Sequence, residues 1–168
     1  MCSSDLLEDR VAVRVPMQWT DGPNGGFSDA STEQLVAPVR RDGPYGYARV
    51  NVASQRHDPE SLLNWMERMI RLRKECHEIG WGAPTRLSTG EDRVFAHRYD
   101  WEGRALLFAH NLACEAKSVQ LENGIEDVAH LDDLLTGERV EHDGTLRLEL
   151  DASGYRWFQI TRTRGVVR

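Results

Sequence analysis

From Val94 to Ile160 the chain alternates apolar and polar residues along short stretches that are separated by turn residues. Alternation with a period of two places successive side chains on opposite faces of a β-strand. The stretch Ala105–Leu112 is apolar at nearly every position, which predicts a central strand buried on both faces. Several short strands with regular turns between them are typical of an antiparallel β-sandwich. We therefore expect a mostly β fold with a C-terminal sandwich.

Two turn signals help to set the strand pattern. Glu102-Gly103 separates two alternating stretches and predicts a two-residue hairpin. Asp143-Gly144 is a strong hairpin signal into the stretch that carries Leu146, Leu148 and Leu150. The chain shows no internal repeat and no low-complexity tract.

The first third of the chain lacks any such period. Five of its prolines lie within the first 59 residues, together with many glycines. Irregular segments longer than roughly 12–15 residues are usually functional loops or disordered. The aromatic residues Trp19, Phe27, Tyr45 and Tyr47 argue against disorder. We expect a long loop that packs on a surface that this chain does not contain.

A helix is expected after this loop. Asp58 is a good N-cap and Pro59 suits a first helical position. Seven of the eleven residues from 62 to 72 are apolar, too many for a helix that buries a single stripe. The sequence therefore predicts a helix from Pro59 that is buried on two sides.

Charge and composition exclude several functions. With 21 basic and 27 acidic residues the net charge is −6, so no nucleic-acid partner is expected. No apolar run approaches the ~20 residues of a membrane helix, so no membrane partner is expected either. Three cysteines without metal or redox spacing favour a reducing, cytoplasmic setting. The residues indicate no cofactor and no metal, and they leave the oligomeric state open.

The residues taken by themselves yield no active site. The glycine clusters lack the spacing of a phosphate-binding loop, and there is no nucleophile elbow. His97 and His110 fall within strand patterns and are expected to be half-buried strand residues.

Short motifs in the loop and the helix carry more information. They are Arg14-Val15-Pro16-Met17-Gln18-Trp19, Asn24-Gly25-Gly26-Phe27-Ser28, Tyr45-Gly46-Tyr47, Val50-Asn51-Val52 with Gln55, and Asp58-Pro59-Glu60-Ser61-Leu62-Leu63-Asn64-Trp65. Through these motifs the chain resembles the α-amylase superfamily, glycoside hydrolase family 13, and within it the trehalose synthase group. Val15 and Gly25 depart from the usual Thr and Ala of that group, and both residues are small.

The resemblance implies that the catalytic carboxylates lie on a (β/α)₈ barrel. It also implies that none of them is present here, so no catalytic residue is assigned. Residues 7–82 would be the end of that barrel, with the loop after strand eight and the eighth helix. Residues 83–168 would be the C-terminal sandwich. Residues 1–6 are expected to be foreign, because Cys2–Leu6 matches a translated sequencing adapter and suggests a truncated reading frame.

Three residues are candidates for contact with a sugar through this resemblance. Arg14 would reach the floor of a glucose pocket and pair with a carboxylate there, or else form a structural ion pair. Trp19 and Phe27 are weaker candidates, for which packing is the alternative role. Asn51 and Gln55 are expected to fix the loop by hydrogen bonds.

Three functions remain open. The first is a part of an enzyme that interconverts maltose and trehalose, both bound through the missing barrel. The second is a part of an oligo-1,6-glucosidase or α-glucosidase, a group that usually lacks the Ser61–Trp65 motif. The third is a sandwich that binds glycans without catalysis, which is disfavoured because residues 85–160 show no exposed aromatic row distinct from the core pattern.

Overall fold

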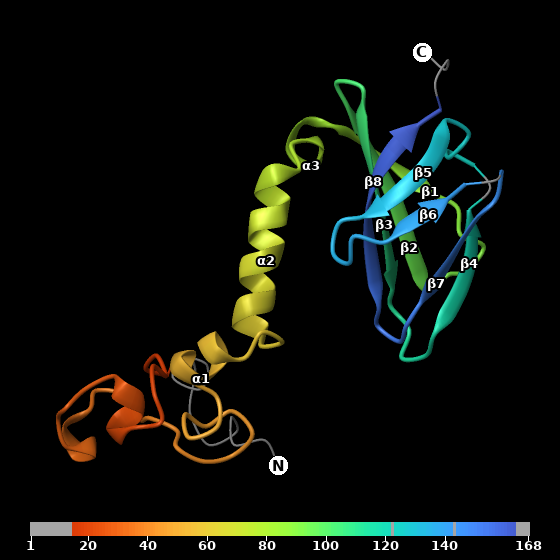
Figure 1. Cartoon of the computed structure of the whole chain (residues 1–168). Coiled ribbons are helices and arrows are strands. Elements are labelled where there is room, and N and C mark those ends of the chain that lie inside the picture. The colour runs from red at the N-terminus through yellow and green to blue at the C-terminus, as the bar shows by residue number, and fades with distance from the viewer. Residues whose placement is uncertain (1–14, 122, 143, 164–168) are drawn as a thin grey trace. The chain divides into compact units, whose positions relative to one another are not determined.

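The computed structural model describes residues 15–121, 123–142 and 144–163 (Figure 1). The chain divides into two compact units, Met1–Arg71 and Leu72–Arg168, which are described separately below.

The described part of the first unit is largely irregular, as its proline and glycine content predicts. Its elements are two short 3₁₀ helices, the short helix α1 and the longer helix α2, which runs past the boundary between the units. The sequence did not predict α1, whose N-terminus is capped by Asn51: the Asn51 Oδ1 accepts from Ser54 N at 2.8 Å. The bounds are η3 Pro23–Gly26, η4 Thr32–Gln34, α1 Val52–His57 and α2 Leu62–Glu75.

The predicted start of the longer helix was wrong by three residues. Helix α2 begins at Leu62 rather than Pro59, and Asp58 instead closes a local turn by accepting from Glu60 N at 2.9 Å. Ser61 is the residue that caps α2, because its Oγ accepts from Asn64 N at 3.2 Å. Serine and aspartate are both good caps, so local propensity alone does not choose between them.

The expected burial of α2 on two sides is not found among the described residues. Of its apolar side chains Met69 is buried, at 8% exposure. Leu62, Met66 and Ile70 recur every four residues along one side of the helix and are 69%, 43% and 49% exposed. An apolar stripe of this width is typical of a helix that packs on something else.

The second unit confirms the antiparallel sandwich. A six-stranded sheet in the order β1-β2-β3-β8-β5-β6 faces a two-stranded sheet, β4-β7. β3 lies between β2 and β8 and is buried at five consecutive positions, as its apolar sequence predicts. The strands are β1 Ala83–Leu87, β2 Val94–Trp101, β3 Arg104–Asn111, β4 Lys117–Leu121, β5 Val128–Asp133, β6 Arg139–Glu141, β7 Leu146–Leu150 and β8 Tyr155–Arg162.

The first of the two hairpin predictions is confirmed. β2 and β3 form a hairpin around Glu102 and Gly103, whose φ angles are 45° and 80°. These are the left-handed values that a tight turn requires.

The second hairpin prediction, at Asp143-Gly144, was wrong. The strand before this signal, β6, belongs to the large sheet, and the strand after it, β7, belongs to the small one. β7 pairs with β4 instead, and its leucines are buried against the opposite sheet. Asp143 itself lies outside the described residues.

The core lies between the two sheets, and β2 contributes its small side chains to it. Val94 and Ala96 are 4% and 1% exposed, whereas Phe95 is 41% exposed on the opposite face. The aromatic side chains of β2 therefore lie on the outer face, where Phe95 is exposed and Tyr99 and Trp101 are partly buried. Between the sheets, the bulky side chains of Leu107, Phe158 and their neighbours already fill the space.

A short segment packs on the outer face of the large sheet. Cys76 is buried against Leu106 and Phe108, and burial raises the pKa of its thiol. Glu78 of the short helix α3 (Glu78–Trp81) is fully buried and lies 2.7 Å from Arg104 Nε. Within the described residues, no helix is both long enough and apolar enough to span a membrane.

Candidate functional site

Of the three candidate sugar-contacting residues, two lie in the described part of the chain. Arg14 lies outside the described residues. Trp19 and Phe27 are 47% and 51% exposed, so about half of each side chain is open to a ligand or to a packing partner. The structure leaves both roles available to them.

Backbone hydrogen bonds join the segments that carry the family motifs. Trp19 N and Thr20 N both donate to Gly25 O, at 2.7 and 2.9 Å. Val52 N and Ala53 N, at the start of α1, donate to Gln18 O and Trp19 O at 2.9 and 3.0 Å. The start of α1 thus holds the segment that carries Trp19, although more than thirty residues separate them.

The turn after Trp19 is left-handed over three residues. Asn24, Gly25 and Gly26 have φ angles of 53°, 66° and 70°. Asn24 is buried and its Nδ2 donates to Ser28 O and Ala30 O at 2.9 and 2.7 Å, which stabilises this conformation. A side chain at Gly25 would lie 3.3 Å from Tyr47, so glycine fits better here than the alanine usual in the family.

The predicted structural roles of Asn51 and Gln55 are confirmed. The Nδ2 of Asn51 donates to Tyr47 O at 2.9 Å, while its Oδ1 caps α1. The side-chain Oε1 of Gln55 accepts from Leu63 N at 3.0 Å, and its backbone oxygen accepts from Ser61 Oγ at 2.7 Å. These contacts fix the connection between the two helices.

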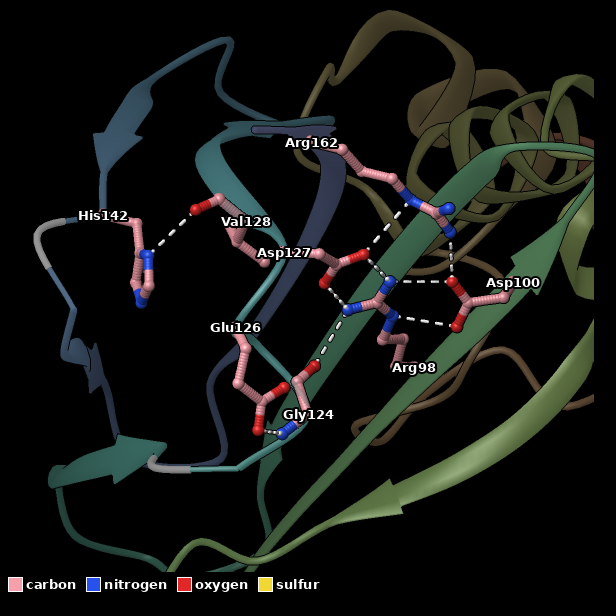
Figure 2. A network of polar contacts seen from close by, with 8 residues as sticks. All are labelled: Arg98, Asp100, Gly124, Glu126, Asp127, Val128, His142 and Arg162. Carbon is pink, nitrogen blue, oxygen red and sulfur yellow. Dashed lines mark hydrogen bonds and ion pairs between the residues drawn. The ribbon is translucent and has the colours of Figure 1, made fainter. Parts of the chain in front are cut away.

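A second cluster, in the sandwich, was not predicted from the sequence (Figure 2). The guanidinium of Arg98 lies between Asp100 and Asp127, with N–O distances of 2.6 to 2.8 Å, and it also donates to Gly124 O at 2.9 Å. Arg162 completes the cluster through contacts to the same two carboxylates. These residues line a recess of about 420 Å³.

The charges of this cluster satisfy one another. The hydrogen bonds that Arg98 donates to Asp127 lower the pKa of Asp127 and raise the pKa of Arg98. A carboxylate that stays ionised is a poor general acid, and a guanidinium does not give up a proton near neutral pH. The cluster is therefore suited to holding strands together rather than to catalysis.

One sequence signal could have identified this cluster. Arg98 follows Val94 and Ala96 at a spacing of two and therefore shares their face of the strand, which the structure buries. A charged residue at an inward position needs a buried partner of opposite charge. The distant partner Asp127 could not be found from local spacing.

The described residues contain no group of three His, Cys, Asp or Glu side chains that could hold a metal ion.

Two family profiles match the chain. The profile of the α-amylase catalytic domain matches residues 3–82, and that of the sucrose hydrolase-like C-terminal domain matches residues 103–159.

The chain is 32% identical to the trehalose synthase/amylase TreS of Mycobacterium tuberculosis, over 92% of this chain and 27% of that protein. It is 39% identical to the trehalose synthase of Thermus thermophilus, over 67% of this chain and 12% of that protein. A probable oligo-1,6-glucosidase of Bacillus subtilis is 30% identical, over 67% of this chain and 19% of that protein. The chain thus spans about a quarter or less of the length of these relatives.

Among solved structures, the trehalulose synthase MutB has the same fold over 90% of this chain and 26% of its own. The TM-score is 0.69, at 22% sequence identity. An isomaltulose synthase of Erwinia rhapontici matches with a TM-score of 0.67 at 19% identity, over the same share of each chain. By these matches the chain belongs to the α-amylase superfamily, glycoside hydrolase family 13, and resembles the trehalose synthases within it.

Proposed function

We propose that this chain is part of a trehalose synthase that interconverts maltose and trehalose by intramolecular glucosyl transfer. The observation that carries the proposal is the identity of 32% to TreS over 92% of the chain, which includes both units. The 39% identity to the Thermus enzyme supports the same proposal over a shorter stretch.

In this proposal the first unit supplies a closing loop. A glucosyl-enzyme must be kept from water while the freed glucose turns and attacks again. The left-handed turn at Asn24 and the bonds from α1 hold the loop segment that carries Trp19. A loop fixed at both ends can present one shape to the pocket, which limits the entry of water.

Arg14 is the residue proposed to contact the sugar. A planar guanidinium can bind a carboxylate with two hydrogen bonds while donating to sugar oxygens. Trp19 and Phe27 would offer ring faces to the glucose unit as weaker contributors. In the full enzyme, Arg14→Ala should remove ~2–4 kcal/mol of transition-state stabilisation. Arg14→Lys should restore only part of it.

The control is Arg49→Ala, which removes an exposed arginine of the same unit. Steady-state kinetics on maltose compare the three variants. Near-normal kcat/KM in Arg14→Ala would remove Arg14 from the site, and an equal loss in Arg49→Ala would point to a general effect of charge.

The test of the function itself uses two proteins. The 168-residue chain alone should form neither trehalose nor glucose from maltose, because it lacks the carboxylates of a retaining mechanism. A full-length enzyme that contains this chain should form trehalose, measured by chromatography of the products. Trehalose from the short chain, above a mock preparation, would overturn the assignment.

A second candidate function is an oligo-1,6-glucosidase or α-glucosidase, favoured by the 30% identity to the Bacillus protein. An α-glucosidase would release only glucose from maltose, and an oligo-1,6-glucosidase would instead cleave the α-1,6 bond of isomaltose. The same product analysis therefore separates the two candidates. The third alternative, a glycan-binding sandwich, would be supported by binding of residues 72–168 to a glycan array without any turnover.

A further inference from the structure

The outer face of the large sheet carries a grid of aromatic and imidazole rings. Alternation places every second residue of β2, β3 and β8 on this face, and the strand register aligns them in rows. One row joins His97, Phe108 and Trp157, and the next joins Phe95, His110 and Tyr155.

His97 lies near the centre of this grid. Its ring stacks on that of Phe108 at 5.0 Å with an interplanar angle of 14°, and on that of His110 at 5.9 Å and 10°. Phe95 and Tyr99 contact it from its own strand at 4.9 and 5.4 Å. The His97 Nδ1 is buried and has no hydrogen-bond partner among the described residues.

Few charged groups face the two histidines. Arg86 of β1 is paired with His97 across the strands, and its positive charge does not stabilise an imidazolium. Tyr155 of β8 is paired with His110, and Tyr99 lies beside His97 along β2. A phenol side chain supplies no negative charge to an imidazolium near neutral pH.

Two carboxylates near this face form ion pairs with arginines. Asp132 of β5 shares the outer face but is bound to Arg139 at 2.7 Å. At about 4.8 Å per strand, it lies three strands, or about 14 Å, from the strand of His97. From the segment packed on the sheet, Glu78 is paired with Arg104, and Cys76 is a buried thiol.

The neutral forms of both rings are therefore favoured in the folded chain. Burial lowers the pKa of His97 and of His110, and the neighbouring imidazole lowers the pKa of His97 further. An imidazolium donates from both nitrogens, and the buried His97 Nδ1 has no acceptor to donate to among the described residues.

Phe108, on which the His97 ring stacks, also supports a neighbouring segment. Phe108 and Leu106 are the buried residues on which Cys76 packs, with Leu72 and Ile79 beside it. Trp157 completes this contact edge-on to Phe108 at 5.0 Å. A shift of the His97 ring thus changes the support of residues 72–79.

We propose that the stacked pair His97–His110 is a proton-sensitive latch on this face: while both rings are neutral, residues 72–79 stay packed on Phe108, and when the rings take up protons they move into water and this segment loosens. The latch is built into the sandwich and does not depend on the identity of the substrate.

The test measures the chain directly. Nuclear magnetic resonance of the histidine ring protons, assigned with single His→Phe variants, gives the titration of each histidine. Hydrogen exchange of the amides from 72 to 81, corrected for intrinsic rates, is measured between pH 7.5 and pH 5. We expect His97 and His110 to titrate below the free-histidine value of about 6.5. Between pH 7.5 and pH 5, amide protection should fall about tenfold for each unit by which the pKa of a histidine lies below the free value.

The double variant H97F/H110F keeps the ring volume and removes both protonation sites, so protection at 72–81 should no longer depend on pH. His57→Gln, which changes an exposed histidine of the first unit, is the matched control and should retain the wild-type dependence. The same pH dependence in H97F/H110F would overturn the latch. Titration of both histidines at or above pH 6.5 in the wild-type chain would also overturn it, whether or not the double variant folds.

Discussion

Residues 15–71 and residues 72–163 of this chain are held together in different ways. In the second region a closed apolar core of sixteen described residues lies between two sheets, and Leu107 and Phe158 at its centre are fully buried. In the first region the buried apolar side chains among the described residues are Tyr47 and Met69. Its turns are instead fixed by side-chain hydrogen bonds such as those of Asn24 and Asn51.

This difference shows what each region needs from its surroundings. Burial of apolar surface is the largest favourable contribution to folding, at roughly 25 cal/mol per Å². Individual hydrogen bonds contribute only about 1 kcal/mol each. The sandwich therefore has a source of stability of its own. The first region keeps a specific backbone shape while Trp19, Phe27 and the side of α2 that carries Met66 stay open. An open apolar surface of this kind favours association.

The largest expected difference between the regions is in protease sensitivity. Limited proteolysis of the chain should cut first between residues 15 and 57, and a core that contains residues 83–163 should survive. The chain should also self-associate when measured by light scattering. A monodisperse monomer that resists cleavage between residues 15 and 57 would show that the first region is stable by itself and would remove the contrast.

The next largest difference between the regions should be the loss of stability when an apolar side chain is truncated. Phe158→Ala leaves a cavity between the sheets and should lower the free energy of unfolding by about 3–5 kcal/mol. Met66→Ala, at a side chain that is 43% exposed, should change it by less than about 1 kcal/mol. Chemical denaturation followed by circular dichroism measures both variants. Equal losses would mean that α2 is as tightly packed as the sandwich.

Loss of an ion pair should also destabilise the chain more in the sandwich than in the first region. Arg98→Met leaves Asp100 and Asp127 without their main partner and should destabilise the sandwich by about 2–3 kcal/mol, less than a fully buried pair because both acids are partly exposed. Arg71→Met breaks an exposed pair with Glu67 and should cost under about 0.5 kcal/mol. Denaturation midpoints compare the two variants. An Arg98→Met variant as stable as the wild-type chain would show that burial of the methionine side chain offsets the lost contacts of Arg98.

A local effect is expected in the first region. Asn51→Ala removes the cap of α1 and the bond to Tyr47 O, at a cost of about 1 kcal/mol. Hydrogen exchange at residues 52–57 should rise, while the midpoint of sandwich unfolding should not move. A matching shift of the sandwich would contradict the independence of the two regions.

The smallest expected effect is a loss of stability at low pH. The pKa of Asp127 is lowered in the folded chain, so its contribution to stability is complete above the unfolded pKa of about 3.9 and is lost as the pH falls through the lower folded value. Unfolding midpoints between pH 5 and pH 2 should show this loss in the wild-type chain and less of it in Arg98→Met. An identical acid profile in the two proteins would remove Arg98 as the cause.

Local sequence was sufficient for several features. The alternation of β2, the hairpin at Glu102 and Gly103, and the central place of β3 all follow from the chain alone, because a strand fixes its own period and a tight turn its own φ angles. The roles of Asn51 and Gln55 in the loop were also predicted. The motifs between Pro16 and Trp65 are specific enough to indicate the family by themselves.

Only the tertiary structure decided which face of each strand is inside. The period of β2 is the same whether Phe95 or Ala96 points into the core, and the space left between the sheets by β3 and β8 selects the smaller residues. The partners of Arg98 and the stacking of His97 on Phe108 were likewise decided there, since Asp127 and Phe108 come from other segments of the chain. A sequence determines local conformation through nearby atoms, but the pairing of distant side chains depends on how the sheets pack.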